Sequence, residues 1–163
     1  MPDVYVAAGS NINPGARLRE ALALLEGYYG PLRVSPAYRN ATVGFSGDDF
    51  VNLAVGFTTD ESPRQVIGKL QSIEARCGRP RSAPKFAPRA MDLDILLHGD
   101  LVCEEPGIVL PRPDLVRRAY MLKPMVDIAP DLVHPTEGQT LADLWAESAD
   151  RAHELVPVRL ADL

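Results

Sequence analysis

Two extended segments follow each other along this chain with no helix between them. LRVSPAYR at residues 32–39 and FVNLAVGFTT at residues 50–59 are separated only by a polar loop that carries Gly44. A purely doubly wound parallel sheet needs strands and helices to alternate, so this order excludes it. We therefore expect an α+β fold with an antiparallel or mixed sheet.

The other segments complete an order of strand, helix, strand, strand, helix, strand and then mixed elements. Each long helix is expected to start where a capping residue precedes a proline, at Asn13-Pro14 and at Ser62-Pro63. Pro36 cannot donate a ladder hydrogen bond, so segment 32–39 is expected at a sheet edge. The expected strands are residues 4–10, 32–39, 50–59, 91–97, 101–102 and 155–160, and the expected helices begin at residues 14, 63 and 141.

A chain of 163 residues has the length of one ordinary domain, and we expect a single domain over residues 1–163. No apolar run approaches the roughly 20 residues that span a bilayer, and the first residues lack the pattern of a signal peptide. These features predict a cytoplasmic protein without membrane contact. A net charge of -5 argues against a general nucleic-acid binder, and Cys77 and Cys103 alone form neither a disulfide framework nor a zinc site.

Two aspartates interrupt the apolar strand AMDLDILL. Because side chains alternate along a strand, Asp92 and Asp94 point to one face, while Leu93, Ile95 and Leu97 point to the other. The Cα atoms of the two aspartates are expected to be about 7 Å apart. Two carboxylates on a half-buried sheet repel each other and lose hydration, and a divalent cation between them removes both costs. Oxygen ligands favour Mg²⁺, which binds through one or two carboxylates and substrate phosphates.

Basic side chains gather just upstream, and residues 76–89 contain no acid. In an acidic protein such a concentration favours a small anionic ligand held at one place. A metal beside cationic side chains is the usual arrangement for phosphoryl transfer, which predicts a magnesium–nucleotide site. The alternatives are that the basic run is a solvated loop and that the aspartates pair with its arginines or face water. The basic residues are Arg76, Arg79, Arg81, Lys85 and Arg89.

Other polar and aromatic residues allow two interpretations each. Asn52, in an apolar strand, is either a structural amide or a group that reads the edge of a polar heterocycle. Phe50, Phe86 and Tyr120 either stack on a flat ligand or belong to the core. The histidines show no metal spacing and no partnered serine or cysteine, so no catalytic role is assigned to His98, His134 or His153.

The stretch KFAPRAMDLDILL resembles the signature of the 6-hydroxymethyl-7,8-dihydropterin pyrophosphokinase family, in which proline and arginine precede an Asp-x-Asp pair in an apolar strand. The resemblance runs through nearly the whole chain. VAAGSN looks like the family's first strand and turn, YRNATVG like its substrate-loop region and DFVNLAV like its pterin-side strand. LQSIEARCGRPR is similar to its central helix and first basic pair, and AYMLKPMVDIAPDLVHP to its C-terminal third.

The resemblance implies transfer of pyrophosphate from ATP to the hydroxymethyl oxygen of 6-hydroxymethyl-7,8-dihydropterin, with release of AMP, as a step of folate biosynthesis. It also implies a ferredoxin-like α+β fold, a three-layer α/β/α arrangement around a mostly antiparallel (mixed) sheet. Two Mg²⁺ ions would bridge the ATP phosphates. The implied partners are the two substrates, without nucleic acid or membrane, and we expect a monomer.

Roles carried over from the family fall on specific positions of this chain. Asp92 and Asp94 would hold the two ions, with Asp92 also near the attacking hydroxyl. Arg79 and Arg89 would bind the phosphates and complete the catalytic set. The other ATP-binding residues would be Gln71, Glu74, Arg81, Lys85, Ile95, Arg112 and Arg118, and the pterin-binding residues Asn40, Val43, Gly44, Phe50, Asn52, Phe86, Asp92 and Tyr120.

Three positions depart from the family pattern. Arg112, in LPRP, takes the place of a usual histidine and cannot lose its charge. Phe86 replaces a tryptophan, which keeps a stacking ring and loses the indole donor. Asn40-Ala41 stands where threonine and proline are commoner, and the loop from Gly44 to Asp49 is short. Two rivals remain: another magnesium-dependent nucleotidyltransferase or phosphohydrolase, and a non-catalytic pterin- or nucleotide-binding paralogue.

Overall fold

The computed structural model describes residues 1–40, 49–78 and 91–163. Its strands are β1 (Asp3–Ser10), β2 (Arg33–Val34), β3 (Ala37–Asn40), β4 (Phe50–Thr58), β5 (Asp92–His98), β6 (Cys103–Glu105), β7 (Ile108–Leu110) and β8 (Leu155–Val158). Six of them form one sheet in the order β5-β1-β4-β3-β8, with β2 paired to β4. All pairings in this sheet are antiparallel, and β6 and β7 form a separate hairpin.

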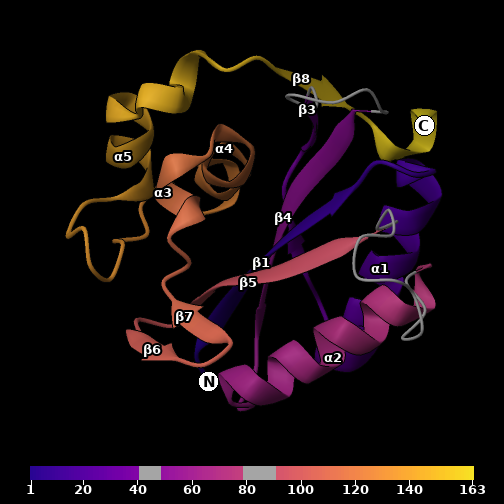
Figure 1. Ribbon diagram of the computed structural model, residues 1–163, viewed down its shortest axis with the longest axis horizontal. Coiled ribbons are helices and arrows are strands. Elements are labelled where there is room, and N and C mark those ends of the chain that lie inside the picture. The colour runs from indigo at the N-terminus through magenta and orange to yellow at the C-terminus, as the bar shows by residue number, and fades with distance from the viewer. Residues whose placement is uncertain (41–48, 79–90) are drawn as a thin grey trace.

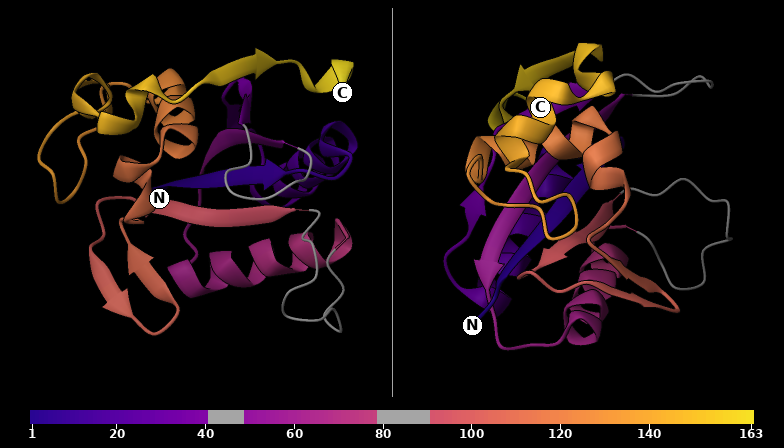
Figure 2. Two further views of the ribbon diagram at one scale, coloured as in Figure 1. Left: turned by 45° about the horizontal axis from the view of Figure 1, so that its top comes forward. Right: turned by 90° about the vertical axis from the view of Figure 1, so that its left-hand side faces the viewer.

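Helices lie on both faces of the sheet (Figure 1; Figure 2). On one face are α1 (Pro14–Tyr29) and α2 (Pro63–Arg76), and on the other are α3 (Asp114–Arg117), α4 (Ala119–Ile128) and α5 (Leu141–Glu147). The short helices η1 (Ala149–Ala152) and η2 (Leu160–Asp162) flank β8. This arrangement confirms the expected three-layer α+β fold. Across the described ranges, none of the helices combines the length and apolar character needed to cross a membrane.

Each face of the sheet has its own hydrophobic core. The larger cluster joins α1 and α2 to the sheet through side chains such as Leu18, Leu70 and Leu93. The smaller cluster joins α3, α4 and α5 to it through Leu122 and its neighbours. The ligand-sized cleft described below opens on the side of the smaller cluster. The largest fully buried side chains of the smaller cluster are Leu96, Leu97, Leu115 and Leu122.

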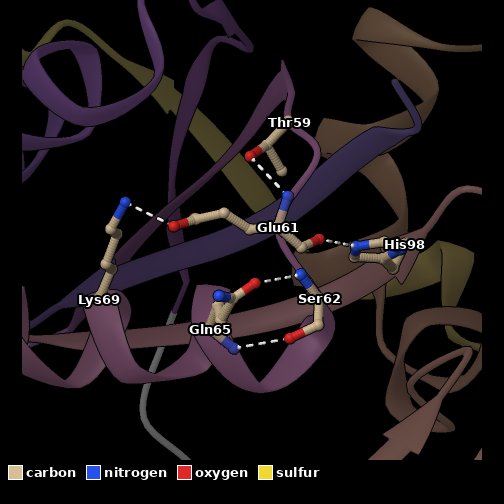
Figure 3. A network of polar contacts seen from close by, with 6 residues as sticks. All are labelled: Thr59, Glu61, Ser62, Gln65, Lys69 and His98. Atoms are coloured by element: carbon tan, nitrogen blue, oxygen red, sulfur yellow. Dashed lines mark hydrogen bonds and ion pairs between the residues drawn. The ribbon is translucent and has the colours of Figure 1, made fainter.

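The start of α2 is fixed to the end of β5 by a polar network (Figure 3). Ser62 and Gln65 form a capping box, in which each side chain accepts a hydrogen bond from the other residue's backbone N–H. The backbone oxygen of Glu61 lies 2.8 Å from Nε2 of His98. The carboxylate of Glu61 lies 2.6 Å from Nζ of Lys69. α1 begins without such a cap, because Asn13 is left-handed and its side chain makes no capping bond. Both helices begin at their prolines as predicted, but the prediction that the side chain of Asn13 caps α1 is wrong.

The segment 32–39 is not one edge strand, which corrects the expectation. Ser35 interrupts it, because its side chain accepts the N–H of Ala54 at 2.8 Å while its own N–H bonds the oxygen of Ala54. Pro36 falls in the gap between β2 and β3, so no ladder bond is lost there. β3 does not lie at an edge, because β8 pairs with its outer side, whereas β2 is paired with β4 alone among the described strands. The expected strand at 101–102 is likewise shifted to β6.

A bulge in β5 changes the face of its last residues. Tyr5 pairs with Leu97 and Val6 with Ile95, so Leu96 is an extra residue opposite a single β1 step. Leu97 consequently joins the core on the α4 side, whereas Leu93 and Ile95 lie in the core on the α2 side. The prediction that Leu97 shares a face with Leu93 is therefore wrong, because strict alternation stops at the bulge.

Candidate active site

Asp92 and Asp94 lie on one face of β5, next to the small residues of β1. Asp92 is paired with Gly9 and Asp94 with Ala7, and cross-strand partners share a face of the sheet. Both carboxylates are half-buried, while Leu93 between them is buried on the opposite face. The small side chains of β1 leave open space beside the carboxylates, near the end of the sheet that β5 forms.

A single cross-strand row runs through this space. Tyr38 pairs with Asn52, Asn52 with Gly9, and Gly9 with Asp92, across β3, β4, β1 and β5. Side chains in such a row project from the same face. Gly9 lies between the amide of Asn52 and the carboxylate of Asp92, and it has no side chain to fill the space between them. A Cβ at this position would lie only 2.5 Å from Oδ1 of Asn52. The row therefore provides a floor with one polar group on either side.

Asn52 is only 9% exposed, and its amide nitrogen is buried. Within the part of the chain that the structure describes, this Nδ2 has no hydrogen-bond partner. An unmade hydrogen bond at a buried donor costs about 1–3 kcal/mol, so such a group usually meets a ligand or water. Of the two interpretations of Asn52, the geometry favours a group that reads a ligand edge.

A cleft of about 610 Å³ contains this row, a volume suited to a small-molecule site. It lies between the sheet and the segment that contains α3 and α4, and its far wall comes from the region of η1. Its lining residues are Ala7, Ala8, Gly9, Asn40, Phe50, Asn52, Asp92, Asp94, Arg112, Asp114, Arg118, Tyr120, Met121, Asp150 and His153.

Arg112 brings positive charge to the carboxylate end of the cleft. Its backbone N–H bonds the oxygen of Leu96 at 3.0 Å, which attaches the residue to β5. Its Nη1 lies 3.6 Å from Oδ1 of Asp94, and each side chain is about one-third exposed, at 34% and 36%. A pair this exposed contributes little to stability, so the guanidinium is available for exchange with a ligand anion.

Tyr120 and Phe50 line the same cleft from two different elements. Phe50 is the first residue of β4, and Tyr120 is the second residue of α4. Burial raises the pKa of Tyr120, and the nearby Asp114 adds to this, so its phenol stays protonated at neutral pH. Two half-buried rings in one cleft suit a flat heterocycle.

The structure collects eight of the predicted site residues in this cleft. Three others lie outside its lining: Gln71 is exposed on α2, Ile95 is buried in the core, and Glu74 accepts the N–H of Leu93 at 3.0 Å. Their ATP-binding role stays a prediction. The collected residues are Asn40, Phe50, Asn52, Asp92, Asp94, Arg112, Arg118 and Tyr120. Val43, Gly44, Arg79, Arg81, Lys85, Phe86 and Arg89 lie outside the described residues.

Two lining residues of the C-terminal region were missed from the sequence. Asp150 and His153 reach the cleft from η1 and the residue that follows it. Neither has a motif around it that predicts a site. Small residues of β1 were missed as well, although the Ala-Ala-Gly stretch in a strand was a signal for close approach of a ligand.

The donor set fits magnesium held jointly with a ligand. Asp92 and Asp94 offer oxygen atoms from one face of a strand, and no group of three or more His, Cys, Asp or Glu side chains is placed for a metal within residues 1–40, 49–78 and 91–163. Two carboxylates are the usual protein contribution when substrate phosphates complete the shell of Mg²⁺. The set does not fit zinc, which prefers His and Cys ligands.

An antiparallel α+β sheet whose cleft sets paired carboxylates beside arginines is typical of a metal-dependent enzyme of phosphoryl transfer. The fold matches crystal structures of Plasmodium falciparum HPPK-DHPS. The wild-type protein with SDX-DHP has a TM-score of 0.71 at 15% identity, over 90% of this chain and 43% of that chain. A second wild-type structure gives a TM-score of 0.73 at 14% identity, over 90% and 44%. This chain therefore spans less than half of those proteins.

Sequence comparison names the family. The profile of 7,8-dihydro-6-hydroxymethylpterin-pyrophosphokinase (HPPK) matches residues 5–130. The 2-amino-4-hydroxy-6-hydroxymethyldihydropteridine pyrophosphokinases of Pseudomonas aeruginosa and Haemophilus influenzae are 35% and 31% identical, over 94% and 96% of this chain and 96% and 98% of their own lengths. Folic acid synthesis protein fol1 of Pneumocystis carinii is 32% identical over 95% of this chain, which spans only 21% of that protein.

This chain belongs to the HPPK family. Its activity is therefore pyrophosphoryl transfer from ATP to 6-hydroxymethyl-7,8-dihydropterin in folate synthesis. The family uses Mg²⁺, in agreement with the paired carboxylates of β5.

Proposed function

We propose that this cleft binds the two substrates side by side and that the row from Asn52 to Asp92 aligns the pterin hydroxyl with the nucleotide. One observation carries the proposal: a buried amide nitrogen that has no hydrogen-bond partner among the described residues and a half-buried carboxylate flank Gly9 on the same face of the sheet. An amide donor suits the edge of a polar heterocycle, and a carboxylate suits the hydroxyl or metal end. The space between them is where the two reacting groups meet.

The pterin half of the site is proposed on the Asn52 side. Nδ2 of Asn52 would donate to an acceptor on the heterocycle, and the rings of Phe50 and Tyr120 would lie against its faces. Asn40 lines the same end of the cleft. From the family resemblance we add Val43, Gly44 and Phe86 to this half.

The nucleotide half is proposed on the Asp94 side. Arg112 and Arg118 line the cleft there and would bind phosphate oxygens, so that Arg112 exchanges its contact with Asp94 for a ligand anion. Since arginine keeps its charge at any working pH, this contact would persist where a histidine would titrate. The family resemblance adds Gln71, Glu74, Arg79, Arg81, Lys85, Arg89 and Ile95.

Asp92 and Asp94 would hold two Mg²⁺ ions, the number that the family resemblance implies. Once bound, the metal neutralises phosphate charge and so favours attack on phosphorus. Only Gly9 separates Asp92 from Asn52 in the cross-strand row, so Asp92 would also orient the substrate hydroxyl. The hydroxyl oxygen forms a bond to the β-phosphorus, the bond from that phosphorus to the α-phosphate oxygen breaks, and AMP leaves while the hydroxyl proton is released. Positioning and charge suffice for this displacement.

We also propose that residues 1–163 act as one domain and as a monomer in the cytoplasm. The single domain is supported by the two hydrophobic cores, which are both built on the same sheet. A reaction that consumes ATP supports the cytoplasmic setting.

The test is turnover of the protein with ATP, Mg²⁺ and 6-hydroxymethyl-7,8-dihydropterin, with the nucleotide product identified. AMP and pyrophosphorylated pterin in equal amounts, dependent on both Mg²⁺ and the pterin, are expected. ADP would indicate a simple kinase, and free pyrophosphate a nucleotidyltransferase or hydrolase. Binding of both substrates without turnover would indicate the non-catalytic paralogue.

A further inference from the structure

Residues 148–153 lie outside the segment 5–130 that matches the family, yet they complete one wall of the cleft. The segment is held by its own contacts. Oγ of Ser148 accepts the N–H of Asp150 at 3.2 Å, and Nη1 of Arg151 donates to the oxygen of Ala146 at 2.7 Å. β8 follows directly and anchors the segment to the sheet, because it pairs with β3.

His153 contacts the pterin end of the site through Asn40. Nε2 of His153 is hydrogen-bonded to Oδ1 of Asn40, and both side chains line the cleft. Asn40 is paired with Phe50 on one side and with Leu155 on the other, so the strand register itself brings His153 to this place. The contact therefore links the C-terminal segment to the strand end that carries Phe50.

Asp150 contacts the opposite wall. Its Oδ2 accepts the backbone N–H of Ala119, the first residue of α4, at 2.7 Å. The first N–H groups of a helix have no partner within the helix, so a carboxylate from elsewhere in the chain fixes where α4 begins. Tyr120 is the next residue, and its ring lines the cleft. The position of this ring therefore depends on Asp150.

We propose that His153 and Asp150 are positioning residues for the dihydropterin, an inference that rests on the function proposed above. His153 holds the oxygen of the Asn40 carboxamide, which leaves the amide nitrogen as the end that offers hydrogen bonds to a bound heterocycle. Asp150 holds the start of α4, and with it the ring of Tyr120. Neither residue touches the reacting atoms, so both act on pterin affinity rather than on the chemical step.

His153→Ala tests the first contact, with His153→Gln as the conservative variant, because a glutamine amide nitrogen reaches about as far as Nε2 of histidine. Loss of one hydrogen bond that orients Asn40 is expected to raise KM for the dihydropterin roughly three- to tenfold. KM for ATP and kcat are expected to stay within about twofold of the wild type, and His153→Gln is expected to recover most of the loss. Glu154→Ala, an exposed neighbour outside the cleft, is the matched control.

Asp150→Ala and Asp150→Asn test the second contact in the same assay. The alanine variant is expected to raise KM for the dihydropterin, and the asparagine variant, which keeps an acceptor oxygen, is expected to restore it. Thermal unfolding of each variant checks that it is folded at the assay temperature, and direct binding of the dihydropterin replaces KM for a variant that is too slow to assay.

The inference is overturned if His153→Ala and Asp150→Ala leave KM and Kd for the dihydropterin unchanged, or if KM for ATP rises equally. It is also overturned if the conservative variants behave like the alanine variants. Such results with an active wild-type enzyme leave the proposed function intact. An inactive wild type with an intact fold would instead contradict the proposed function.

Discussion

Gly9 and Asn52 are cross-strand partners, and a Cβ at Gly9 would lie 2.5 Å from Oδ1 of Asn52. Heavy atoms do not approach that closely without a bond or hydrogen bond, so any side chain at residue 9 would displace the amide. Gly9 is also the partner of Asp92 on the other side of β1. The absence of its side chain therefore sets both the orientation of Asn52 and the space between the amide and the carboxylate.

Gly9→Ala is expected to impair the enzyme more than it destabilises it. The new methyl group would push Asn52 out of its position and fill the floor of the cleft, so kcat/KM for the dihydropterin should fall by about tenfold or more. Steady-state kinetics with ATP held saturating measures the effect. Gly27→Ala, in α1 where a Cβ meets nothing within 4 Å, is the matched control and should leave kinetics unchanged while it stabilises the helix by about 0.5–1 kcal/mol. Equal kinetics of the two variants would contradict this account of Gly9.

Asn52→Ala separates a ligand-reading amide from a structural one. Because Nδ2 has no partner in the described part of the protein, removing it should change the free energy of unfolding by less than about 1 kcal/mol. KM for the dihydropterin should rise by roughly tenfold or more, since the heterocycle loses a buried donor. Urea unfolding and steady-state kinetics give the two values. A large loss of stability with little change in KM would mean that Asn52 is a structural amide.

The shared face of the two aspartates could be predicted from the sequence because side-chain alternation is a local property of a strand. The bulge at Leu96 could not, because it depends on how β5 pairs with β1, far away in the chain. The same holds for the meeting of Asn52 and Asp92, which needs β1 to lie between β4 and β5. Local patterns specified the candidates, and long-range pairing decided which of them share a site.

Asp94→Ala is expected to abolish turnover, with a kcat at least about 10³-fold lower, because it would remove one of the two proposed ligands of the metal beside the phosphates. Arg112 would also lose its partner at 3.6 Å. Measurement of AMP release over a range of Mg²⁺ concentrations checks this, with Asp100→Ala, an exposed residue after β5, as the control. Near-native activity of the Asp94 variant would refute the metal assignment.

The network at the start of α2 predicts a pH-dependent contribution to stability. Burial alone would raise the pKa of Glu61, but the neighbouring Lys69 and Tyr29 outweigh it and lower the pKa below its ordinary value. A lowered pKa in the folded state stabilises the protein above the unfolded-state pKa, and this contribution is lost as the pH falls through the folded-state pKa. Glu61→Gln should thus cost on the order of 1 kcal/mol at pH 7, and the difference should shrink below about pH 4.

Urea unfolding of the wild type and of Glu61→Gln at pH 7, 5 and 3.5 measures this difference. Glu104→Gln, an exposed carboxylate on β6, serves as the control. A wild-type advantage that stays constant down to pH 3.5 would show that the charge of Glu61 does not contribute.

The cleft wall formed by Asp150 and His153 could not be predicted from the sequence. Asp150 and His153 stand in a stretch without a motif, and their places in the cleft follow from the pairing of β8 with β3 and from the cap that Asp150 gives to α4. The histidine pattern alone gave no reason to assign His153 a role. Its partner Asn40 lies 113 residues away in the chain, and local sequence periodicity does not predict contacts over such a separation.

The most direct test of the central claim follows the β-phosphorus of ATP. The protein is supplied with Mg²⁺, the dihydropterin and ATP labelled at either the α- or the β-phosphorus, and the products are separated. Attack on the β-phosphorus predicts that the β-label appears on the pterin and the α-label remains in AMP. An α-label on the pterin, or a β-label in free pyrophosphate, would contradict the account.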